Sequence, residues 1–197
     1  MTRDPRVRAR SPQDALEFVR LTRPRDFERV WARIPEASRR VIETTAKTDW
    51  IPLEHDHHIS DAWEPVFGEQ EALKVLSDSV LVVFESPVLK PVVRGALRLF
   101  GATPRALVKA VPKACDHIYR DFYDVRIDTD ATDAAKVFFE DIEPRVMQYP
   151  SYLFVWRAVF MAMFRLSEHE GTVRLEVTEA ARRATYHLEW AHERSRS

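Results

Sequence analysis

The residues best suited to chemistry lie in one short segment, EHDHHISD, at positions 54–61. It places three histidines and three acidic residues within eight consecutive positions. Imidazole and carboxylate groups bind zinc, iron and manganese, and an imidazole also exchanges protons near neutral pH. Because Pro52 precedes the segment, we expect a helix over residues 52–66 that begins just before these side chains.

A helix separates these side chains into groups, because successive residues are about 100° apart around its axis. The apolar side is expected to carry five residues: His55, Ile59, Ala62, Trp63 and Val66. Glu54, His58 and Asp61 lie together at its edge and are the set that could converge on one metal ion. His57 is expected to point toward water. The structural alternative is that Glu54 and Asp56 simply stabilise the positive start of the helix, since three ligands on one short helix rarely complete a site.

The segment 87–113 contains six basic residues and no acidic one. Lys90, Arg94 and Arg98 are four residues apart, so they form one stripe on a helix. With Arg105 and Lys109 they could bind an acidic protein partner. The alternative is a solvated face whose charge is balanced by residues 116–143, which hold nine acidic and three basic residues. Few aromatic residues interleave with the basic ones, so we do not expect nucleic acid.

Residues 150–166 predict a helix that is apolar on nearly every side and therefore buried. Arg157 and Arg165 lie eight positions apart on it, and a buried arginine needs a partner. Glu140, Asp141 or Glu168 could form a structural ion pair with them. Alternatively, the helix lines a pocket for an apolar ligand whose anionic end an arginine anchors. The lining would then comprise Tyr152, Trp156, Arg157, Phe160, Met161 and Arg165.

Composition excludes several other classes of function. The chain has 197 residues, a net charge of −1 and one cysteine, so an internal disulfide and a multi-thiolate metal site are excluded. Its four glycines form no phosphate-binding motif. The longest apolar run is too short and too charged to span a membrane, and no secretion signal is evident, so we expect a cytoplasmic protein. Ser151, Cys115 and Ser167 lack the motifs of catalytic nucleophiles, which favours a non-enzymatic role.

The pattern of hydrophobic residues predicts one α+β domain over residues 11–197, after a disordered basic tail at 1–10. Residues 11–115 have helical spacing interrupted by prolines, and Pro112 is expected to end the last helix. From residue 116 to 190 we expect strand–strand–helix–strand–strand and an antiparallel sheet. The final hairpin has the loop 179–182, which pairs Val177 with Ala184, Leu175 with Tyr186, and Val173 with Leu188.

Three segments, WIPLEHD, ESPVLKPVVRGALRLFG and IYRDFYDVRID, resemble a family of domains of similar length that is expanded in myxobacteria. That family resembles, distantly, the 4-vinyl-reductase, TRAPP-subunit and haem–nitric-oxide-binding fold group. The resemblance implies a domain that binds a small hydrophobic ligand or a partner protein. Vinyl-reductase-type domains often carry several cysteines, whereas this chain has Cys115 alone. Haem–nitric-oxide sensors carry Tyr-x-Ser-x-Arg, but here Leu153 follows Tyr149 and Ser151 in the arginine position, so haem is not supported.

We therefore expect a non-enzymatic sensing or interaction domain that binds an apolar or amphipathic ligand near residues 150–166. The first alternative is a metal-binding protein, with hydrolysis as one option for its activity, that uses Glu54, His58 and Asp61. A structural module that forms a homodimer is the second.

Overall fold

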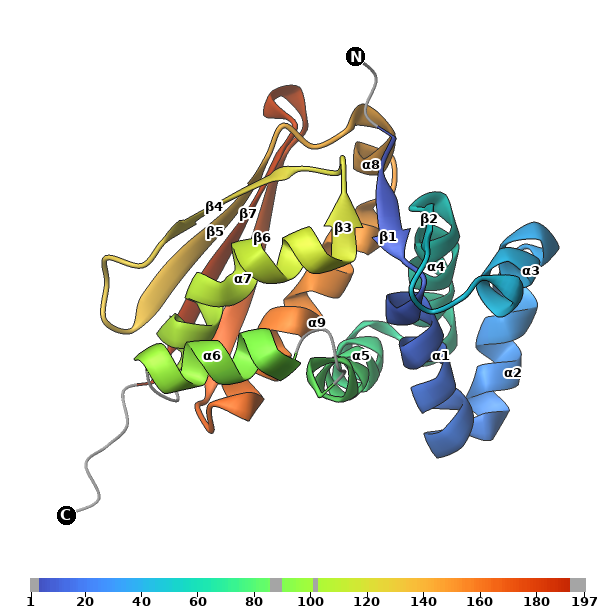
Figure 1. Cartoon of the computed structure of the whole chain (residues 1–197), viewed down its shortest axis with the longest axis horizontal. Helices are drawn as coiled ribbons and strands as arrows, with labels where there is room; N and C mark the ends of the chain where they lie inside the picture. Colours follow the sequence, from blue (N-terminus) through green and yellow to red (C-terminus); the bar gives the residue numbers. More distant parts are fainter. Residues whose placement is uncertain (1–3, 86–89, 101–102, 192–197) are drawn as a thin grey trace.

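The computed structural model of the chain describes residues 4–85, 90–100 and 103–191. Its first part is helical, as expected, and its second part contains the sheet (Figure 1). The helices of the first part are α1 (Arg10–Thr22), α2 (Pro24–Arg33), α3 (Glu36–Thr44), α4 (Glu54–Phe67), α5 (Glu69–Phe84), α6 (Lys90–Phe100) and α7 (Pro104–Ile118).

Local sequence signals explain most of these helix boundaries. Pro24 begins α2, and the Thr103 hydroxyl accepts a hydrogen bond from the Ala106 N–H at the start of α7. Gly68, whose φ of 74° suits glycine, separates α4 from α5. The expectation that Pro112 ends a helix was wrong, because α7 continues through it to Ile118. Burial of Val111 and Cys115 on the inner side of α7 offsets the roughly 3 kcal/mol that an internal proline costs.

The second part has the predicted strand–strand–helix–strand–strand order. It comprises β4 (Asp124–Asp128), β5 (Ala134–Glu140), the short α8 (Pro144–Met147), α9 (Pro150–Leu166), β6 (Gly171–Thr178), the 3₁₀ turn η1 (Glu179–Ala181) and β7 (Arg183–Trp190). The strands form one antiparallel sheet in the order β4-β5-β7-β6. The predicted hairpin register is confirmed, since β6 and β7 pair through all three of the expected residue pairs.

For residues 4–10, the structure corrects the expectation of a disordered tail, while residues 1–3 lie outside the described residues. Residues 6–8 form β1 (Arg6–Arg8), the central strand of a second antiparallel sheet with β2 (Trp50–Pro52) and β3 (Tyr119–Arg120). Val7 is fully buried beneath this sheet. On its outer side the guanidinium groups of Arg8 and Arg120 lie 4.2 and 4.0 Å from the Trp50 ring centre. The small sheet thereby joins the start of α1, the start of α4 and the end of α7.

Helix α9 lies between the four-stranded sheet and the N-terminal helices (Figure 1). On its sheet side Phe160 packs on Tyr186, with ring centres 5.1 Å apart, and the Tyr186 hydroxyl donates to the Leu153 carbonyl at 2.7 Å. On its other side it packs against α4, α5 and α7. This double contact explains why its sequence is apolar on nearly every side. None of the helices in the described part of the chain is long and apolar enough to cross a membrane.

Candidate functional site

An apolar cavity of about 100 Å³ lies where α1, α4, α5, α7 and α9 meet. Most of its surface comes from aliphatic and aromatic side chains that face inward from four of these helices. They include Ile59 and Trp63 on α4, Leu76, Val80 and Val83 on α5, Val111 and Ile118 on α7, and Trp156 and Val159 on α9. Since interiors are normally packed without voids larger than a water molecule, a cavity of this size is a candidate ligand site.

Among the described residues that line the cavity, Asp56 in the first turn of α4 is the one that carries a carboxyl group. This side chain makes no hydrogen bond or ion pair with another residue in the described part of the chain. Burial disfavours its charged form and raises its pKa to about 7. The lining residues of the cavity include no lysine, arginine or histidine among those the structure describes. Asp56 therefore faces the cavity without a cation to neutralise it.

His57, the next residue, is buried beside the cavity and does not point toward water as expected. Its side chain is 2% exposed, and its ring centre lies 4.2 Å from that of Tyr149 and 4.8 Å from that of Tyr152. Neither ring nitrogen has a hydrogen-bond partner within the described residues. Burial lowers the pKa of His57 to about 3, so the ring is neutral at pH 7. The start of α9 covers this side of α4, which helical spacing within α4 could not indicate.

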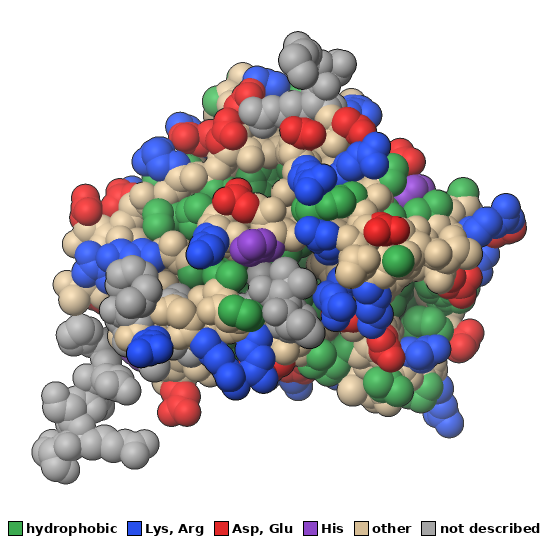
Figure 2. All heavy atoms as spheres, viewed as in Figure 1, with side chains coloured by type: hydrophobic (Ala, Val, Ile, Leu, Met, Phe, Trp, Pro, Cys, Tyr) green, Lys and Arg blue, Asp and Glu red, His purple; other side chains and the backbone are tan. Residues whose placement is uncertain are grey.

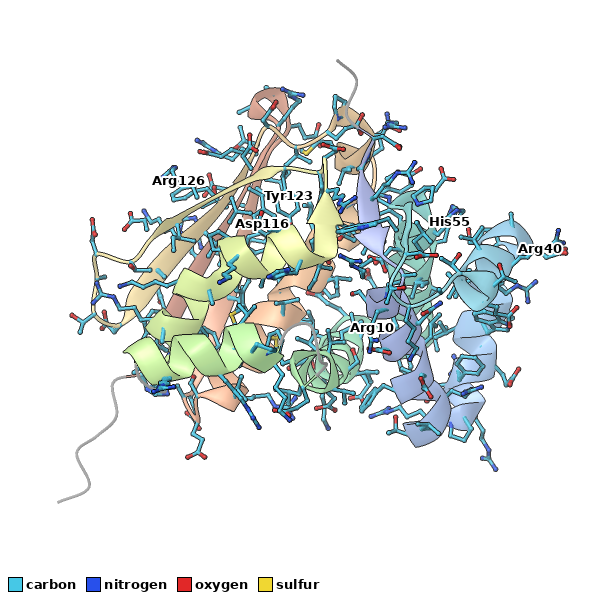
Figure 3. All side chains as sticks on the ribbon, in the orientation of Figure 1. Arg10, Arg40, His55, Asp116, Tyr123 and Arg126 are labelled. Carbon is cyan, nitrogen blue, oxygen red and sulfur yellow. The ribbon has the colours of Figure 1, made fainter. Side chains whose placement is uncertain are left out.

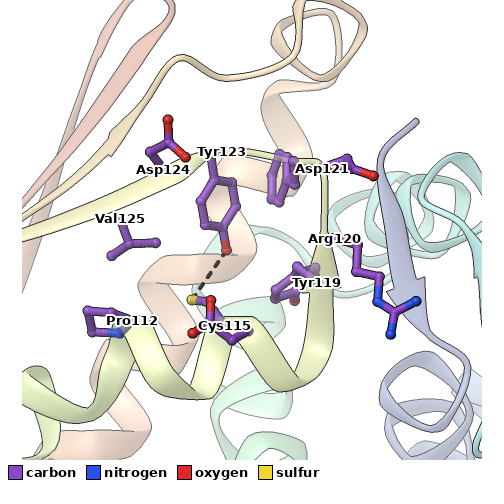
Figure 4. A pocket seen from close by; sticks show the side chains of 10 residues that line it. Pro112, Cys115, Tyr119, Arg120, Asp121, Tyr123, Asp124 and Val125 are labelled. Carbon is purple, nitrogen blue, oxygen red and sulfur yellow. Dashed lines mark hydrogen bonds between the residues drawn. The ribbon is translucent and has the colours of Figure 1, made fainter. Parts of the chain in front are cut away.

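A more open groove of about 410 Å³ lies on the other side of α7, between this helix and the segment from β3 to β4 (Figure 4). Asp116 and Tyr123 contribute to its two sides (Figure 3). Cys115 and Tyr119 line both the groove and the cavity, so they form the wall between them.

This wall is held by a contact between the Cys115 sulfur and the Tyr123 hydroxyl, 3.5 Å apart (Figure 4). Burial raises the pKa of Cys115 to about 12 and raises the pKa values of Tyr119 and Tyr123 as well. Because the thiolate is the nucleophilic form of cysteine, this neutral thiol is poorly suited to covalent catalysis.

Of the six residues predicted to line a ligand pocket, one lines this cavity and the other five lie elsewhere on α9. Trp156 lines the cavity. Tyr152 is buried next to His57 and Tyr119, with ring centres 4.8 and 6.1 Å away. Phe160 faces the sheet, and Met161 is partly buried against the core.

Arg157 and Arg165 form ion pairs across the α5–α9 contact. Arg157 donates to Glu69 at 2.9 Å, and Arg165 donates to Asp78 at 2.5 Å. The partners suggested from the sequence are elsewhere: Glu140 pairs with Arg126 and Asp141 with Arg182, while Glu168 lies beyond the end of α9. Helix α5 supplies the carboxylates because it, rather than the sheet, covers this side of α9.

The three residues proposed as metal ligands are not brought together. Ser38 Oγ lies 2.7 Å from His58 Nδ1, Asp61 accepts a hydrogen bond from the Ser151 hydroxyl, and Glu54 is exposed. Ser38 Oγ also lies 2.9 Å from His55 Nδ1. Within the described residues no group of three His, Cys, Asp or Glu side chains is arranged to hold a metal ion.

The proposed partner surface lies on α6 and α7. Arg94 and Arg98 are exposed on α6, and Lys90 forms an ion pair with Glu85 at 2.5 Å. Lys109 is exposed on α7, whereas the Nε atom of Arg105 is buried. Figure 2 shows Lys and Arg side chains gathered along the edge of the molecule formed by α6.

Asp56 and the linings from α5 and α7 were not identified from the sequence. For Asp56 a signal exists, because Ile59, Ser60 and Trp63 follow it at spacings of three, four and seven and therefore share its side of the helix. That pattern places a carboxylate on a largely apolar face. The contributions of α5 and α7 depend on how helices pack and have no local signal.

Comparison with known proteins identifies the fold. No protein-family model matches the sequence, and no curated protein matches it. Among solved structures, the Fe(II) unliganded H-NOX protein from K. algicida is similar over 96% of this chain and 100% of its own, with a TM-score of 0.64 and 9% identity. An H-NOX structure from a study of haem distortion is similar over 94% and 95%, with a TM-score of 0.54 and 8% identity. The chain therefore has the fold of haem–nitric-oxide-binding (H-NOX) domains.

The residues of this cavity do not fit a haem. Pockets for drug-sized ligands, which are smaller than haem, have volumes of about 300 Å³ or more, compared with about 100 Å³ here. The described lining contains no histidine to bind iron, and its thiol and phenol groups are neutral. Nor does it contain a basic residue for the haem carboxylates, and Asp56 would repel them.

Proposed function

We propose that this chain is a non-enzymatic sensing domain that binds a small apolar or amphipathic molecule in the cavity between α9 and the N-terminal helices. The observation that carries the proposal is the cavity itself, an apolar space of about 100 Å³ in the middle of the helical part. An apolar cavity of comparable size in another protein stays free of water and binds xenon or benzene. A molecule with few heavy atoms fits this volume.

The fold supports a sensing role. Similar solved structures include H-NOX proteins, and one of these comes from a study of haem distortion. In the present chain the cavity contacts Trp156 and Val159 on α9, and the opposite side of the same helix packs on the sheet. A ligand that changes the packing of α9 would therefore act on both halves of the domain. Two discrete packings of such a helix would be needed for signalling.

The test is xenon binding, followed by NMR shifts of methyl groups in the wild type and in two matched variants. Val80→Phe adds a ring to a residue that lines the cavity, whereas Val82→Phe adds the same ring two residues later on α5, where the side chain is 49% exposed. We expect saturable shifts of the Val111 and Val159 methyl groups in the wild type and in Val82→Phe, and none in Val80→Phe. Absence of saturable shifts in the wild type would refute the proposal.

A second candidate function is docking of an acidic protein through α6, which is favoured by the exposure of Arg94 and Arg98. Helix α6 packs on α7, and α7 lines the cavity, so the two functions are compatible. Poly-glutamate is a simple probe of this surface. We expect it to bind in a salt-sensitive manner and to lose affinity in the double variant Arg94→Glu/Arg98→Glu, but not in the control Arg40→Glu on α3.

A further inference from the structure

Three polar side chains that line the cavity, Asp56, Ser60 and Ser79, can accept hydrogen bonds from a ligand. Asp56 offers carboxylate oxygens that receive no hydrogen bond from another residue in the described part of the chain. Two of the three serines in the described lining, Ser60 and Ser79, add acceptors, because their hydroxyl hydrogens are already used within helices. Ser60 donates to the Asp56 carbonyl at 3.1 Å, and Ser79 donates to the Leu76 carbonyl at 2.8 Å. Their oxygen atoms remain able to accept.

The aromatic part of the lining is suited to a positive charge. Trp63, Trp156 and Tyr119 belong to the same cavity as Asp56, and the ring centres of Trp156 and Tyr119 lie 5.8 Å apart. The faces of aromatic rings attract ammonium groups, most strongly when water is excluded. A carboxylate and several aromatic rings in one apolar space together form the recognition chemistry of an organic cation. The absence of any Lys, Arg or His among the described lining residues leaves this role to a ligand.

We propose that the cavity binds a small protonated alkylamine, whose ammonium group pairs with Asp56 and whose alkyl group lies among the aliphatic side chains of α5, α7 and α9. This assignment rests on the proposed function and specifies the ligand class for the same cavity. The ammonium donates to Asp56 and to the serine oxygens, while the alkyl part replaces the void. An anionic ligand is excluded, because Asp56 would repel it and no basic residue in the described lining would neutralise it.

The experiment compares three molecules of nearly equal size: isopropylamine, isopropanol and isobutane. At pH 8 Asp56, with a pKa of about 7, is mostly ionised, and an alkylamine, like lysine with a pKa of about 10.4, is still protonated. Affinities are measured by NMR titration of the Val111 and Val159 methyl groups. We expect isopropylamine to bind at least about tenfold more tightly than isopropanol, because only the amine forms an ion pair with Asp56 inside the cavity.

Two variants then locate the interaction. Asp56→Asn keeps the size of the side chain and removes its charge, and we expect it to weaken isopropylamine at least about tenfold while changing isobutane by less than about twofold. Glu54→Gln removes an exposed charge from the same turn of α4 and should change neither affinity. The comparison of three ligands on the wild type needs no variant, so it stands even if Asp56→Asn folds poorly.

The outcomes separate this inference from the proposed function. If isobutane and xenon bind but isopropylamine has no advantage over isopropanol, the amine assignment is overturned and the cavity remains a binding site. The same holds if the advantage persists in Asp56→Asn. If none of these molecules binds the wild type, both proposals fail.

Discussion

The neighbouring residues Asp56 and His57 should give this protein two opposing dependences of stability on pH. Burial raises the pKa of Asp56 from 3.8 to about 7. The folded state therefore binds a proton that the unfolded state has lost, so the contribution of Asp56 is full below pH 3.8 and is lost as the pH rises through 7. Burial lowers the pKa of His57 from 6.5 to about 3. Its contribution is full above pH 6.5 and is lost as the pH falls toward 3.

The size of each effect follows from the pKa difference. Each unit corresponds to about 1.4 kcal/mol, so complete titration of Asp56 changes the free energy of unfolding by about 4 kcal/mol and that of His57 by about 5 kcal/mol. Between pH 4 and 6.5 the two contributions change by about 3 kcal/mol each, in opposite directions. In the wild type the two changes in the free energy of unfolding nearly cancel over this interval. A variant that lacks one of the two titrating groups therefore shows the pH dependence caused by the other.

Urea unfolding at pH 4, 5.25 and 6.5 measures these contributions. Relative to the wild type, Asp56→Asn should gain about 3 kcal/mol of stability as the pH rises from 4 to 6.5, since only His57 then titrates. His57→Phe, which keeps a ring between Tyr149 and Tyr152, should lose about 3 kcal/mol over the same interval. Glu64→Gln, at an exposed position of the same helix, is the control and should follow the wild type. Parallel profiles for the wild type and both variants would show that folding does not shift the pKa values of Asp56 and His57 in this way.

Further predictions concern packing and access. Gly171→Ala should lower the free energy of unfolding by about 1–3 kcal/mol, because the new Cβ would lie 2.7 Å from the Glu189 carbonyl and from the Phe164 ring. Gly95→Ala should raise the free energy of unfolding by about 0.5–1 kcal/mol, because a Cβ at this position in α6 would meet no atom within 4 Å. Tyr186→Phe removes the hydrogen bond to the Leu153 carbonyl and should cost about 1–2 kcal/mol in urea unfolding. Cys115 is 5% exposed and has a pKa of about 12. It should therefore react with a thiol reagent only as fast as the chain opens. A reaction rate that is proportional to reagent concentration and equal to that of a free thiol would contradict this burial.

The sequence alone was sufficient where one element fixes its own geometry. In the β6–β7 hairpin, Tyr186 and Leu188 alternate with polar residues, and a shift of one position would turn them to water, so their register could be predicted. The helix over 150–166 was equally clear, since it is apolar on nearly every side.

It was insufficient where the geometry depends on segments far apart in the chain. Strand β1 has three residues, too few for a periodic signal, and it forms because residues 50–52 and 119–120 pair with it. The ion pair of Arg157 joins residues 88 positions apart. The burial of His57 depends on the start of α9, and the cavity depends on five helices together. Hydrophobic spacing within one helix identifies an inner face but not the neighbour that covers it.

The two sides of α9 explain how a chain with 9% identity to an H-NOX protein can share its fold and yet have a lining that does not fit haem. On one side, Phe160 and the Leu153 carbonyl are fixed by Tyr186, and this packing determines how the helix lies on the sheet. On the other side, Trp156 and Val159 border a void, where a change of side chain would alter the proposed ligand and leave the sheet contacts in place. Since the fold depends on the first side and the ligand on the second, the Asp56 cavity can recognise a different molecule from haem within an unchanged architecture.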